Sequence, residues 1–363
     1  MARWAWLSLA WVCGAAKLEE SAGRGHCVQA LTRRIINRNI TGCPDSMSWG
    51  ERAAQVLPRT RPIFVDVGAN KGYSLCEFMQ LWSQRRIAFR SWQASIIKFG
   101  RERKSGWLST PVGSCGNCND CEHAPAQPHT RSGGVAYLLE LLPSNHELLR
   151  YVLEDLAIGE IASVHHVAAS NFSGGLIQVD HGIMGDERAS ILSATRQREN
   201  TSSPSGGLVA LQTVDDFLVD QGLGQAALYH VKIDTEGYDA VVLEGMTRTL
   251  SQRLVAILEF EVSFRGWWFN MRPRKERLAQ LGVVHKRELR KLGDVISRLS
   301  AFGYECFWEA GRYLIPISGL CWQNEFEVWR SPWSNVVCAH EPEMVDLFRD
   351  FAFRKRKGRQ RGS

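Results

Sequence analysis

The sequence predicts an α/β fold, in which a mostly parallel sheet is closed by an antiparallel hairpin. From Arg61 onward, short apolar runs alternate with patterns typical of helices, as in sheets whose parallel strands are joined by crossover helices. The first run, residues 63–67, ends in a glycine turn that a helical pattern follows. Near the carboxyl end, strand patterns at 304–308 and 312–318 follow each other closely enough to form the hairpin.

Five apolar runs are the expected strands of the parallel part. They cover residues 63–67, 135–142, 164–169, 228–234 and 254–262. Helical patterns follow at 73–82, from Pro143, and at 289–302, where Gly303 is placed to end the helix. Thr213 and Asp216 match the capping pattern at the start of a further short helix.

The composition is that of a globular protein. The chain has 363 residues, of which 44% are hydrophobic and 23% charged. This excludes a disordered chain, a collagen, a coiled coil and a small disulfide scaffold. The formal net charge of +6 reflects in part a basic run near the carboxyl terminus, at 354–361, which is either a solvated end or a contact for an acidic partner.

The chain divides into four parts. Residues 1–16 are apolar after Arg3 and end in small residues, which predicts a secretory signal peptide, with a transit peptide or an ordinary helix as alternatives. An N-terminal extension follows at 17–60, then the α/β domain at 61–340, then a helix and basic tail at 341–363. Within the domain, the polar stretch 83–134 is expected to be an insert. No other segment approaches transmembrane length.

A secretory route is therefore expected, with a cytoplasmic or organellar protein as the alternative. Glycosylation sequons at Asn39, Asn171 and Asn200 fit that route. Of the ten cysteines, Cys13 lies in the predicted signal, so at least one of the remaining nine lacks an intramolecular disulfide partner.

Three cysteines of the insert have the spacing of metal ligands. Cys115, Cys118 and Cys121 form a C-x2-C-x2-C run, and His123 or His129 follows as a fourth ligand for a structural zinc. The alternative is that these thiols pair with one another or with Cys76, or stay free. An iron–sulfur cluster is not expected, because Pro125 stands where the fourth cysteine would be.

The glycine turn after the first strand indicates the kind of cofactor. Dinucleotide folds use G-x-G-x-x-G, but Asn70 occupies the second glycine position of the turn 68–72 and brings a side chain where a pyrophosphate needs bare backbone. Nicotinamide and flavin dinucleotides are therefore disfavoured. Asp66 before the turn suits a cofactor with a cationic amino group and no phosphate, which describes S-adenosylmethionine, and Glu140 ends the second strand where ribose hydroxyls would bind.

Three strings in this order resemble the signatures of the FkbM-type methyltransferases. They are residues 65–72 (VDVGANKG), 168–174 (AASNFSG) and 231–237 (VKIDTEG), within a similarity that runs from about 61 to 339. The resemblance implies a Rossmann-like class I methyltransferase fold with a seven-stranded sheet, S-adenosylmethionine as cofactor, and O-methylation. It also implies cofactor-binding roles for Asp66, Gly68, Asn70, Gly72, Glu140, Ala169, Ser170 and Asn171.

Two features depart from the family pattern. The family usually has Asp where Asn171 stands, and a glycan on this sequon would crowd an adenine bound there. The cysteine-bearing insert between the first two strands is not required by the pattern.

Carboxylates at two neighbouring strand ends are the candidate catalytic groups. Asp234 and Glu236 are two residues apart and share one face of an extended chain, and Glu259 and Glu261 repeat the spacing on the next strand. Asp234, Glu236 and Glu261 are expected either to supply a general base or to hold a divalent cation. The alternative is that Glu236 only caps the following helix and Lys232 pairs with a neighbouring carboxylate.

The acceptor is expected to be an oxygen. The fourth strand is not followed by the Asn-Pro-Pro-Tyr turn of amino-methylating enzymes. Arg265, Trp267 and Trp268 follow the fifth strand and would stack on a sugar ring or a base, unless they pack a loop on the core. A glycan is the acceptor expected of a secretory protein, and a small metabolite or an RNA ribose that of an intracellular one. A nucleic-acid partner is not favoured, and a binding module without catalysis is the other alternative.

Overall fold

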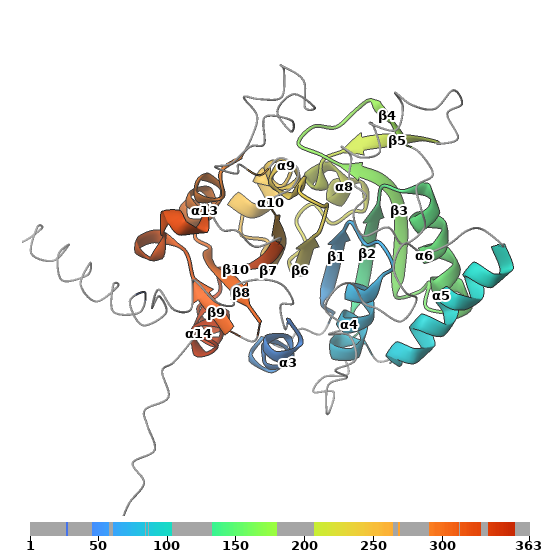
Figure 1. The fold of residues 1–363 in the computed structure, drawn as a ribbon, viewed down its shortest axis with the longest axis horizontal. Coiled ribbons are helices and arrows are strands. Elements are labelled where there is room, and N and C mark those ends of the chain that lie inside the picture. Colours follow the sequence, from blue (N-terminus) through green and yellow to red (C-terminus); the bar gives the residue numbers. More distant parts are fainter. Residues whose placement is uncertain are drawn as a thin grey trace, which may run out of the picture.

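A computed structural model describes residues 27, 46–57, 61–83, 85, 87–103, 133–179, 207–263, 268, 290–311, 313–327 and 333–352. These residues form one sheet with the strand order β4-β5-β3-β2-β1-β6-β7-β10-β8-β9 (Figure 1). The strands are β1 (Ile63–Val67), β2 (Val135–Glu140), β3 (Ala162–Ala169), β4 (Leu176–Val179), β5 (Gly207–Gln212), β6 (Leu228–Ile233), β7 (Val255–Ser263), β8 (Glu305–Ala310), β9 (Tyr313–Pro316) and β10 (Trp333–Ala339).

The middle of the sheet is parallel and both edges are antiparallel. β5, β3, β2, β1, β6 and β7 run parallel, whereas β4 pairs antiparallel with β5, and β10 lies antiparallel between β7 and β8. The predicted α/β class, the five core strands and the β8–β9 hairpin are confirmed. Within the described residues the sheet has ten strands and not the predicted seven, because β4 and β5 extend one side and β10 lies between β7 and β8.

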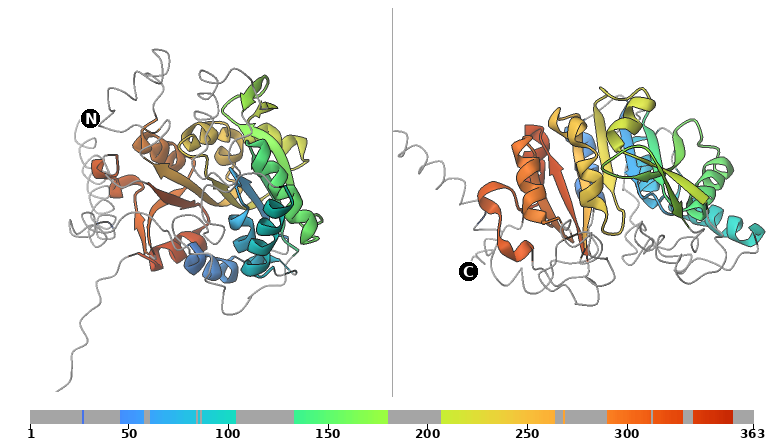
Figure 2. Two further views of the ribbon diagram at one scale, coloured as in Figure 1. Left: turned by 45° about the vertical axis from the view of Figure 1, so that its right-hand side comes forward. Right: turned by 90° about the horizontal axis from the view of Figure 1, so that it is seen from above.

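Helices cover both faces of the sheet (Figures 1 and 2). One core cluster combines the sheet with α3 (Ser46–Val56), α4 (Tyr73–Trp82), α5 (Phe89–Arg103), α6 (Pro143–Asp155) and α14 (Pro342–Asp350). The other combines it with α8 (Val214–Asp220), α9 (Asp239–Glu244), α10 (Thr247–Ser251) and α13 (Leu292–Ala301). Because the central strands are covered on both faces, they are apolar almost without interruption.

Local sequence signals account for several helix ends. The Thr213 hydroxyl accepts a hydrogen bond from the Asp216 backbone at 3.0 Å, which caps α8 as predicted. After α13, Gly303 adopts a φ of 95°, a left-handed conformation that glycine takes without a Cβ penalty. None of the helices in the described ranges is both long and apolar enough to cross a membrane.

The first part of the predicted insert belongs to the core. Over residues 83–134 the sequence predicts a polar segment outside the core, yet α5 packs against α6 and buries Trp92, Ile96 and Phe99. The prediction fails here because the exposed Arg and Lys residues of α5 mask its apolar face. The cysteine run at 115–121 lies outside the described residues.

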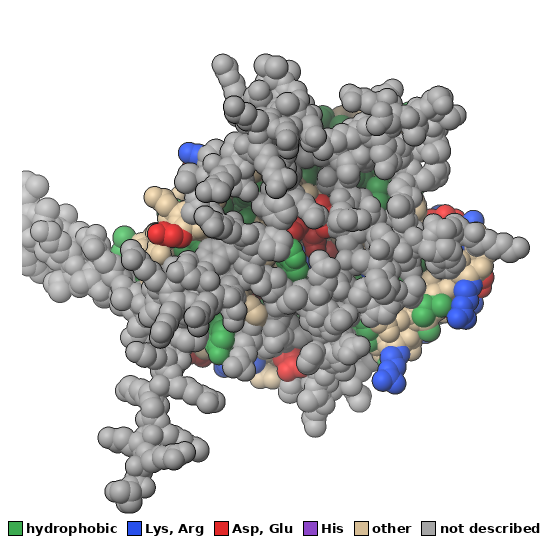
Figure 3. Space-filling view, viewed as in Figure 1, with side chains coloured by type: hydrophobic (Ala, Val, Ile, Leu, Met, Phe, Trp, Pro, Cys, Tyr) green, Lys and Arg blue, Asp and Glu red, His purple; other side chains and the backbone are tan. Residues whose placement is uncertain are grey.

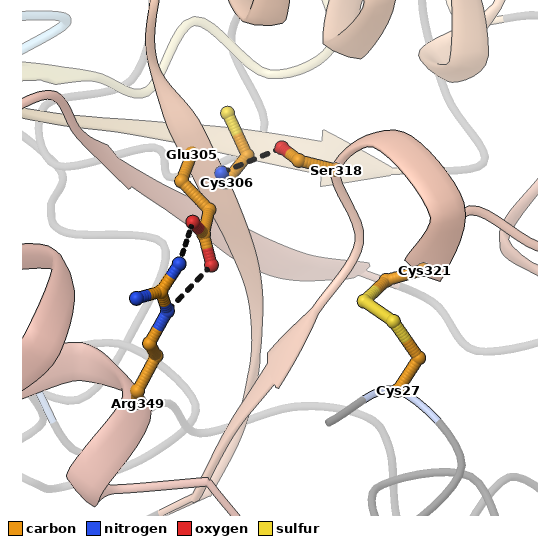
Figure 4. Close-up of a disulfide and its surroundings, with 6 residues drawn as sticks. All are labelled: Cys27, Glu305, Cys306, Ser318, Cys321 and Arg349. Carbon is orange, nitrogen blue, oxygen red and sulfur yellow. Dashed lines mark hydrogen bonds and ion pairs between the residues drawn. A yellow bond between two sulfur atoms is a disulfide. The ribbon is translucent and has the colours of Figure 1, made fainter. Parts of the chain in front are cut away.

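The N-terminal extension is tied to the carboxyl-terminal half. The Trp49 indole of α3 donates a hydrogen bond to Glu309 of β8 at 2.9 Å, and α3 packs against α14. A disulfide joins Cys27 to Cys321, next to the ion pair of Arg349 with Glu305 (Figure 4). A second disulfide joins Cys306 to Cys338, which face each other in the β8–β10 ladder. Cys76 is a buried free thiol.

Loss of the Cys27–Cys321 disulfide should destabilise the fold measurably. The bridge closes a chain segment with a sequence separation of 294, and a cross-link over a long loop restricts the unfolded state, so its loss should cost about 2 to 5 kcal/mol. Urea unfolding of Cys27→Ser, Cys321→Ser and the double variant measures this. Both single variants should lose as much stability as the double variant. Unchanged stability in either single variant would contradict the pairing.

Candidate functional site

The candidate site lies at one edge of the sheet, where the carboxyl ends of parallel strands meet. Asp66 and Glu140 lie on β1 and β2, Asp234 and Glu236 follow β6, and Glu261 lies on β7. Since these four strands are neighbours and parallel, their ends share an edge. Acidic side chains are exposed near the centre of the face drawn in Figure 3. The structure therefore gathers the predicted acidic residues of these four strands.

Hydrogen bonds from its backbone amides hold the turn 68–72 against β2. The Gly68 amide donates to the Leu139 carbonyl at 2.9 Å, and the Asn70 amide donates to the Glu140 carboxylate at 2.8 Å. The other Glu140 oxygen accepts from the Leu142 amide at 2.7 Å. Burial raises the pKa of Glu140 to about 7, although these backbone donors oppose the shift. Glu140 thus fixes the two turns that follow β1 and β2.

Close packing against neighbouring segments of the chain requires glycine at both positions of the turn. A Cβ on Gly68 would lie 2.0 Å from the Asp234 carbonyl oxygen, so only glycine lets the turn meet the end of β6. A Cβ on Gly72 would lie 2.7 Å from the Trp92 ring and 2.8 Å from Leu149. Trp92 also donates its indole N–H to the Lys71 carbonyl at 2.9 Å. Helix α5 therefore supports the turn.

Asp66 is a buried carboxylate with an unused acceptor. Its side chain is almost inaccessible, and its Oδ2 atom has no hydrogen-bond partner within the described ranges. Burial raises the pKa of Asp66 to about 7. The charge of Lys232 opposes this shift, and the nearby carboxylates of Asp234 and Glu259 add to it. A donor bound at this position would satisfy the atom.

Lys232 lies among the carboxylates of the central strands. Its ammonium donates to the Ser74 hydroxyl at 2.8 Å and to Asp234 Oδ2 at 3.4 Å. Burial alone would lower the pKa of Lys232, but Asp234, Glu259 and Asp66 more than offset it and raise the pKa. The ion pair of Lys232 with Asp234 agrees with one half of the alternative expectation, in which Lys232 pairs with a neighbouring carboxylate.

Glu259, which pairs with Lys232 in the ladder between β6 and β7, takes part in a buried polar network. Its two oxygens contact the His230 ring at 3.2 Å and the Asn335 amide at 2.6 Å. Burial alone would raise the pKa of Glu259, but the His230 hydrogen bond and the Lys232 charge hold it below its usual value. Both Glu259 oxygens are therefore engaged within the protein, whereas Asp66 Oδ2 has no hydrogen-bond partner among the described residues.

Asp234, Glu236 and Glu261 form a cluster, as their strand ends predict. One carboxylate oxygen of each lies within 4.8 Å of those of the other two. Glu236 has a φ of 55°. The loop that carries it is held by Asp239, whose carboxylate accepts from the Thr235 amide at 3.3 Å and the Gly237 amide at 3.1 Å. Such an arrangement fixes the backbone of Glu236 from both sides.

Asp239 is a residue of the site that the sequence analysis does not identify. Its position at the start of α9, two residues after Gly237, is a signal that could have identified it as a cap of the loop. Burial and the charge of Asp234 raise the pKa of Asp239 to about 7. For Glu261, burial and the charges of Asp234 and Glu236 raise the pKa well above its usual value.

The hydrogen bonds of the loop after β3 go to segments other than the turn 68–72. The Ser170 hydroxyl lies 3.4 Å from the Tyr238 hydroxyl, and the Ser170 amide donates to the Gln212 carbonyl at 2.9 Å. The Asn171 side-chain amide donates to Glu244 at 2.8 Å, and Arg290 pairs with the same carboxylate. Ala169 packs in the core with Leu139. The adenine-binding role of these three residues stays a prediction, and so does glycosylation of Asn171.

The predicted acceptor residues are only partly described. Trp268 is 4% exposed and stacks on Phe260 of β7 with ring centroids 6.1 Å apart. This agrees with the alternative expectation, in which the tryptophan packs its loop on the core. Arg265, Trp267 and the cysteines Cys115, Cys118 and Cys121 lie outside the described residues, so their roles stay predictions.

The buried carboxylate of Asp66 should make the unliganded protein less stable as the pH rises. The folded pKa of about 7 lies above the ordinary value of 3.8 for an aspartate, so the folded protein retains a proton that the unfolded chain releases between pH 4 and 7. Asp66→Asn removes this penalty. The free energy of unfolding of Asp66→Asn, taken relative to that of the wild type, should therefore increase by roughly 1 to 3 kcal/mol from pH 5 to pH 8.

Urea unfolding at four pH values measures this difference. Asp346→Asn, on an exposed position of α14, is the matched control. The control should show a pH-independent difference from the wild type, and the same flat response in Asp66→Asn would contradict the burial argument.

Comparisons with known proteins give a family and distant structural neighbours. No curated protein matches the sequence significantly. A solved FkbM methyltransferase from Methylobacillus flagellatus KT is 15% identical, with a TM-score of 0.29, and the match covers 56% of this chain and 34% of that one. An O-methyltransferase family protein from Burkholderia thailandensis is 9% identical, with a TM-score of 0.31, and the match covers 82% of this chain and 56% of that one.

The sequence itself carries the stronger result. It matches the Methyltransferase FkbM domain over residues 66–306. This range begins at Asp66 and includes the glycine turn, Glu140 and the carboxylate cluster. The protein thus belongs to the FkbM methyltransferase family.

Proposed function

We propose that this protein is an S-adenosylmethionine-dependent O-methyltransferase that acts on a hydroxyl group of a sugar, a glycan or a small metabolite. The observation that carries this proposal is the contact between the two halves of the site. The turn after Asp66 packs on the backbone of Asp234, and Asp234 belongs to the cluster with Glu236 and Glu261. A methyl donor and an acceptor need to meet in this way, because transfer depends on alignment of the reacting atoms.

The residues around Asp66 fit a cationic cofactor. The buried Asp66 Oδ2 has no hydrogen-bond partner in the part of the chain that the structure describes, and it suits the amino group of S-adenosylmethionine. Acidic residues dominate the strand ends, which favours a positive ligand over a phosphate. When bound, the cofactor supplies a methyl group on a sulfonium.

The remaining cofactor contacts are proposed by position. Glu140 holds the turn through backbone amides, and the remaining lone pairs of its oxygens suit ribose hydroxyls. Gly68, Asn70 and Gly72 shape the turn beside it. The loop Ala169, Ser170 and Asn171 is proposed for the adenine edge.

Glu236 is proposed to remove the acceptor proton. It is partly accessible, it lies beside Gly237, and its backbone is fixed by Asp239. Asp234 accepts from Lys232 and is proposed to orient the acceptor together with Glu261. Arg265 and Trp267 are proposed to line the acceptor side, whereas Trp268 packs in the core.

The acidic edge also bears on the class of acceptor. A polyanionic RNA would be repelled by Asp234, Glu236 and Glu261, because binding of nucleic acid relies on neutralising phosphates with Lys and Arg. A neutral hydroxyl compound meets no such repulsion. A sugar or small metabolite is therefore preferred to an RNA ribose.

The compartment is part of the proposal. Two disulfides, Cys27–Cys321 and Cys306–Cys338, are typical of proteins that fold under oxidising conditions. They support the secretory pathway as the site of folding, which in turn favours a glycan as the acceptor.

Cofactor binding should depend on Asp66. Asp66→Asn replaces an acceptor by an amide that can also donate, and should weaken S-adenosylmethionine binding about 5- to 100-fold, the equivalent of roughly 1 to 3 kcal/mol. Isothermal titration calorimetry measures the affinity, with Asp346→Asn as the control that should bind normally. An unchanged affinity in folded Asp66→Asn would refute the placement of the cofactor.

Turnover should depend on Glu236 without a matching loss of cofactor affinity. Glu236→Gln should lower kcat by about 10²-fold or more, because the nearly isosteric amide cannot accept the proton. Its affinity for S-adenosylmethionine should stay within about threefold. Glu160→Gln, an exposed position, is the control.

The assay uses a labelled methyl donor and a screen of sugars, glycans and small hydroxyl compounds. Full activity of Glu236→Gln with the true acceptor would move the general base to Glu261. A wild type that binds S-adenosylmethionine but methylates none of these acceptors would favour a binding module instead.

A further inference from the structure

The cluster of Asp234, Glu236 and Glu261 brings three carboxyl groups into a small volume. Their oxygens approach one another within 4.8 Å, and carboxylates at this separation repel unless a positive group lies between them. Among the described residues, Lys232 pairs with Asp234, with its ammonium 3.4 Å from Asp234 Oδ2, and it also donates to Ser74. This ion pair therefore lies on the Asp234 side of the cluster.

Glu261 provides a second and independent observation. The residue is 7% exposed, and its Oε2 atom is buried with no hydrogen-bond partner among the residues that the structure describes. Buried carboxylate oxygens almost always accept a hydrogen bond or bind a cation. Its neighbours Asp234 and Glu236 offer carboxylate oxygens, which accept hydrogen bonds and do not donate them.

Strand pairing and hydrogen bonds hold the backbone segments that carry the three carboxylates. Glu261 lies within β7 and pairs with Asn335 of β10 in the ladder. The Asp234 amide donates to the Val67 carbonyl at 2.8 Å, and Asp239 holds the amides on both sides of Glu236. A site built on fixed elements needs little rearrangement to bind an ion.

We propose that Asp234, Glu236 and Glu261 bind a divalent cation with a preference for oxygen ligands, Mg²⁺ or Mn²⁺, and that the acceptor hydroxyl binds to the same ion. Carboxylates are the ligands that these hard cations prefer. Asp234 and Glu236 are only partly buried, so the remaining coordination positions face the side from which an acceptor enters. The second half of the proposal rests on the proposed function.

The chemistry of transfer balances with this arrangement. Coordination makes the hydroxyl more acidic, so its proton passes to the Glu236 oxygen that does not bind the ion, and the hydroxyl oxygen keeps its electron pair. The oxygen then forms the bond to the methyl carbon, the bond between carbon and sulfur breaks, and the sulfur retains that electron pair as S-adenosylhomocysteine. No oxidant or reductant is needed. Acceptors with a second oxygen next to the reacting hydroxyl, such as a sugar diol, would bind the ion through both.

Titration of the chelator-treated full chain with Mn²⁺, followed by electron paramagnetic resonance, tests the site without cofactor or acceptor. We expect about one bound Mn²⁺ per chain that Mg²⁺ displaces. Glu261→Gln and Asp234→Asn should each weaken Mn²⁺ binding at least tenfold, whereas the exposed control Glu160→Gln should bind as the wild type does. Circular dichroism and melting curves establish that each variant is folded, and Asp234→Asn, being partly exposed, serves if Glu261→Gln does not fold.

Two results would overturn the inference. One is a folded wild type that binds no Mn²⁺ at millimolar concentration, and the other is equal Mn²⁺ affinity in the wild type and both variants. S-adenosylmethionine affinity, measured separately in the presence of EDTA, distinguishes this failure from that of the proposed function. Cofactor binding without Mn²⁺ binding would overturn the cation site alone, whereas Mn²⁺ binding without cofactor binding would overturn the proposed function and leave the cation site in place.

Discussion

The close approach of Gly68 to the Asp234 carbonyl is the contact on which the rest of the site depends. β1 and β6 are adjacent parallel strands, so the turn that leaves one meets the loop that leaves the other. A Cβ at position 68 would lie 2.0 Å from the Asp234 carbonyl oxygen, which is far inside any contact distance. Because the two segments touch, the turn beside Asp66 and the loop that carries Glu236 are positioned as one unit.

The cost of this unit is the burial of several carboxylates at one edge. Asp66, Glu140 and Asp239 all have a pKa raised to about 7 by burial, so each opposes folding near neutral pH. The structure limits the cost with donors: Glu140 and Asp239 accept from backbone amides, and Lys232 lies among the others. Asp66 and Glu261 each retain an oxygen that has no such donor in the part of the chain that the structure describes, as expected of groups that bind a ligand.

The sequence predicts the central strands and their ends well, because strands covered on both faces are continuous apolar runs. The proximity of Asp234 and Glu261 follows from that assignment, since neighbouring parallel strands end together. The edge strand β4 and its neighbour β5 are short and expose apolar residues such as Leu176 and Leu208, so no periodicity marks them. β10 is missed because the buried polar residues Ser334 and Asn335 interrupt its pattern.

Contacts between distant segments are what the sequence could not provide. Nothing local shows that Trp92 of α5 holds the glycine turn or that Cys27 pairs with Cys321. The glycines illustrate the same limit. In the motif they look like cofactor contacts, but the structure explains both Gly68 and Gly72 by packing within the protein. These two glycines of the family signature therefore report how the chain folds, and the evidence for chemistry lies in the buried oxygens of Asp66 and Glu261, which have no donor among the described residues.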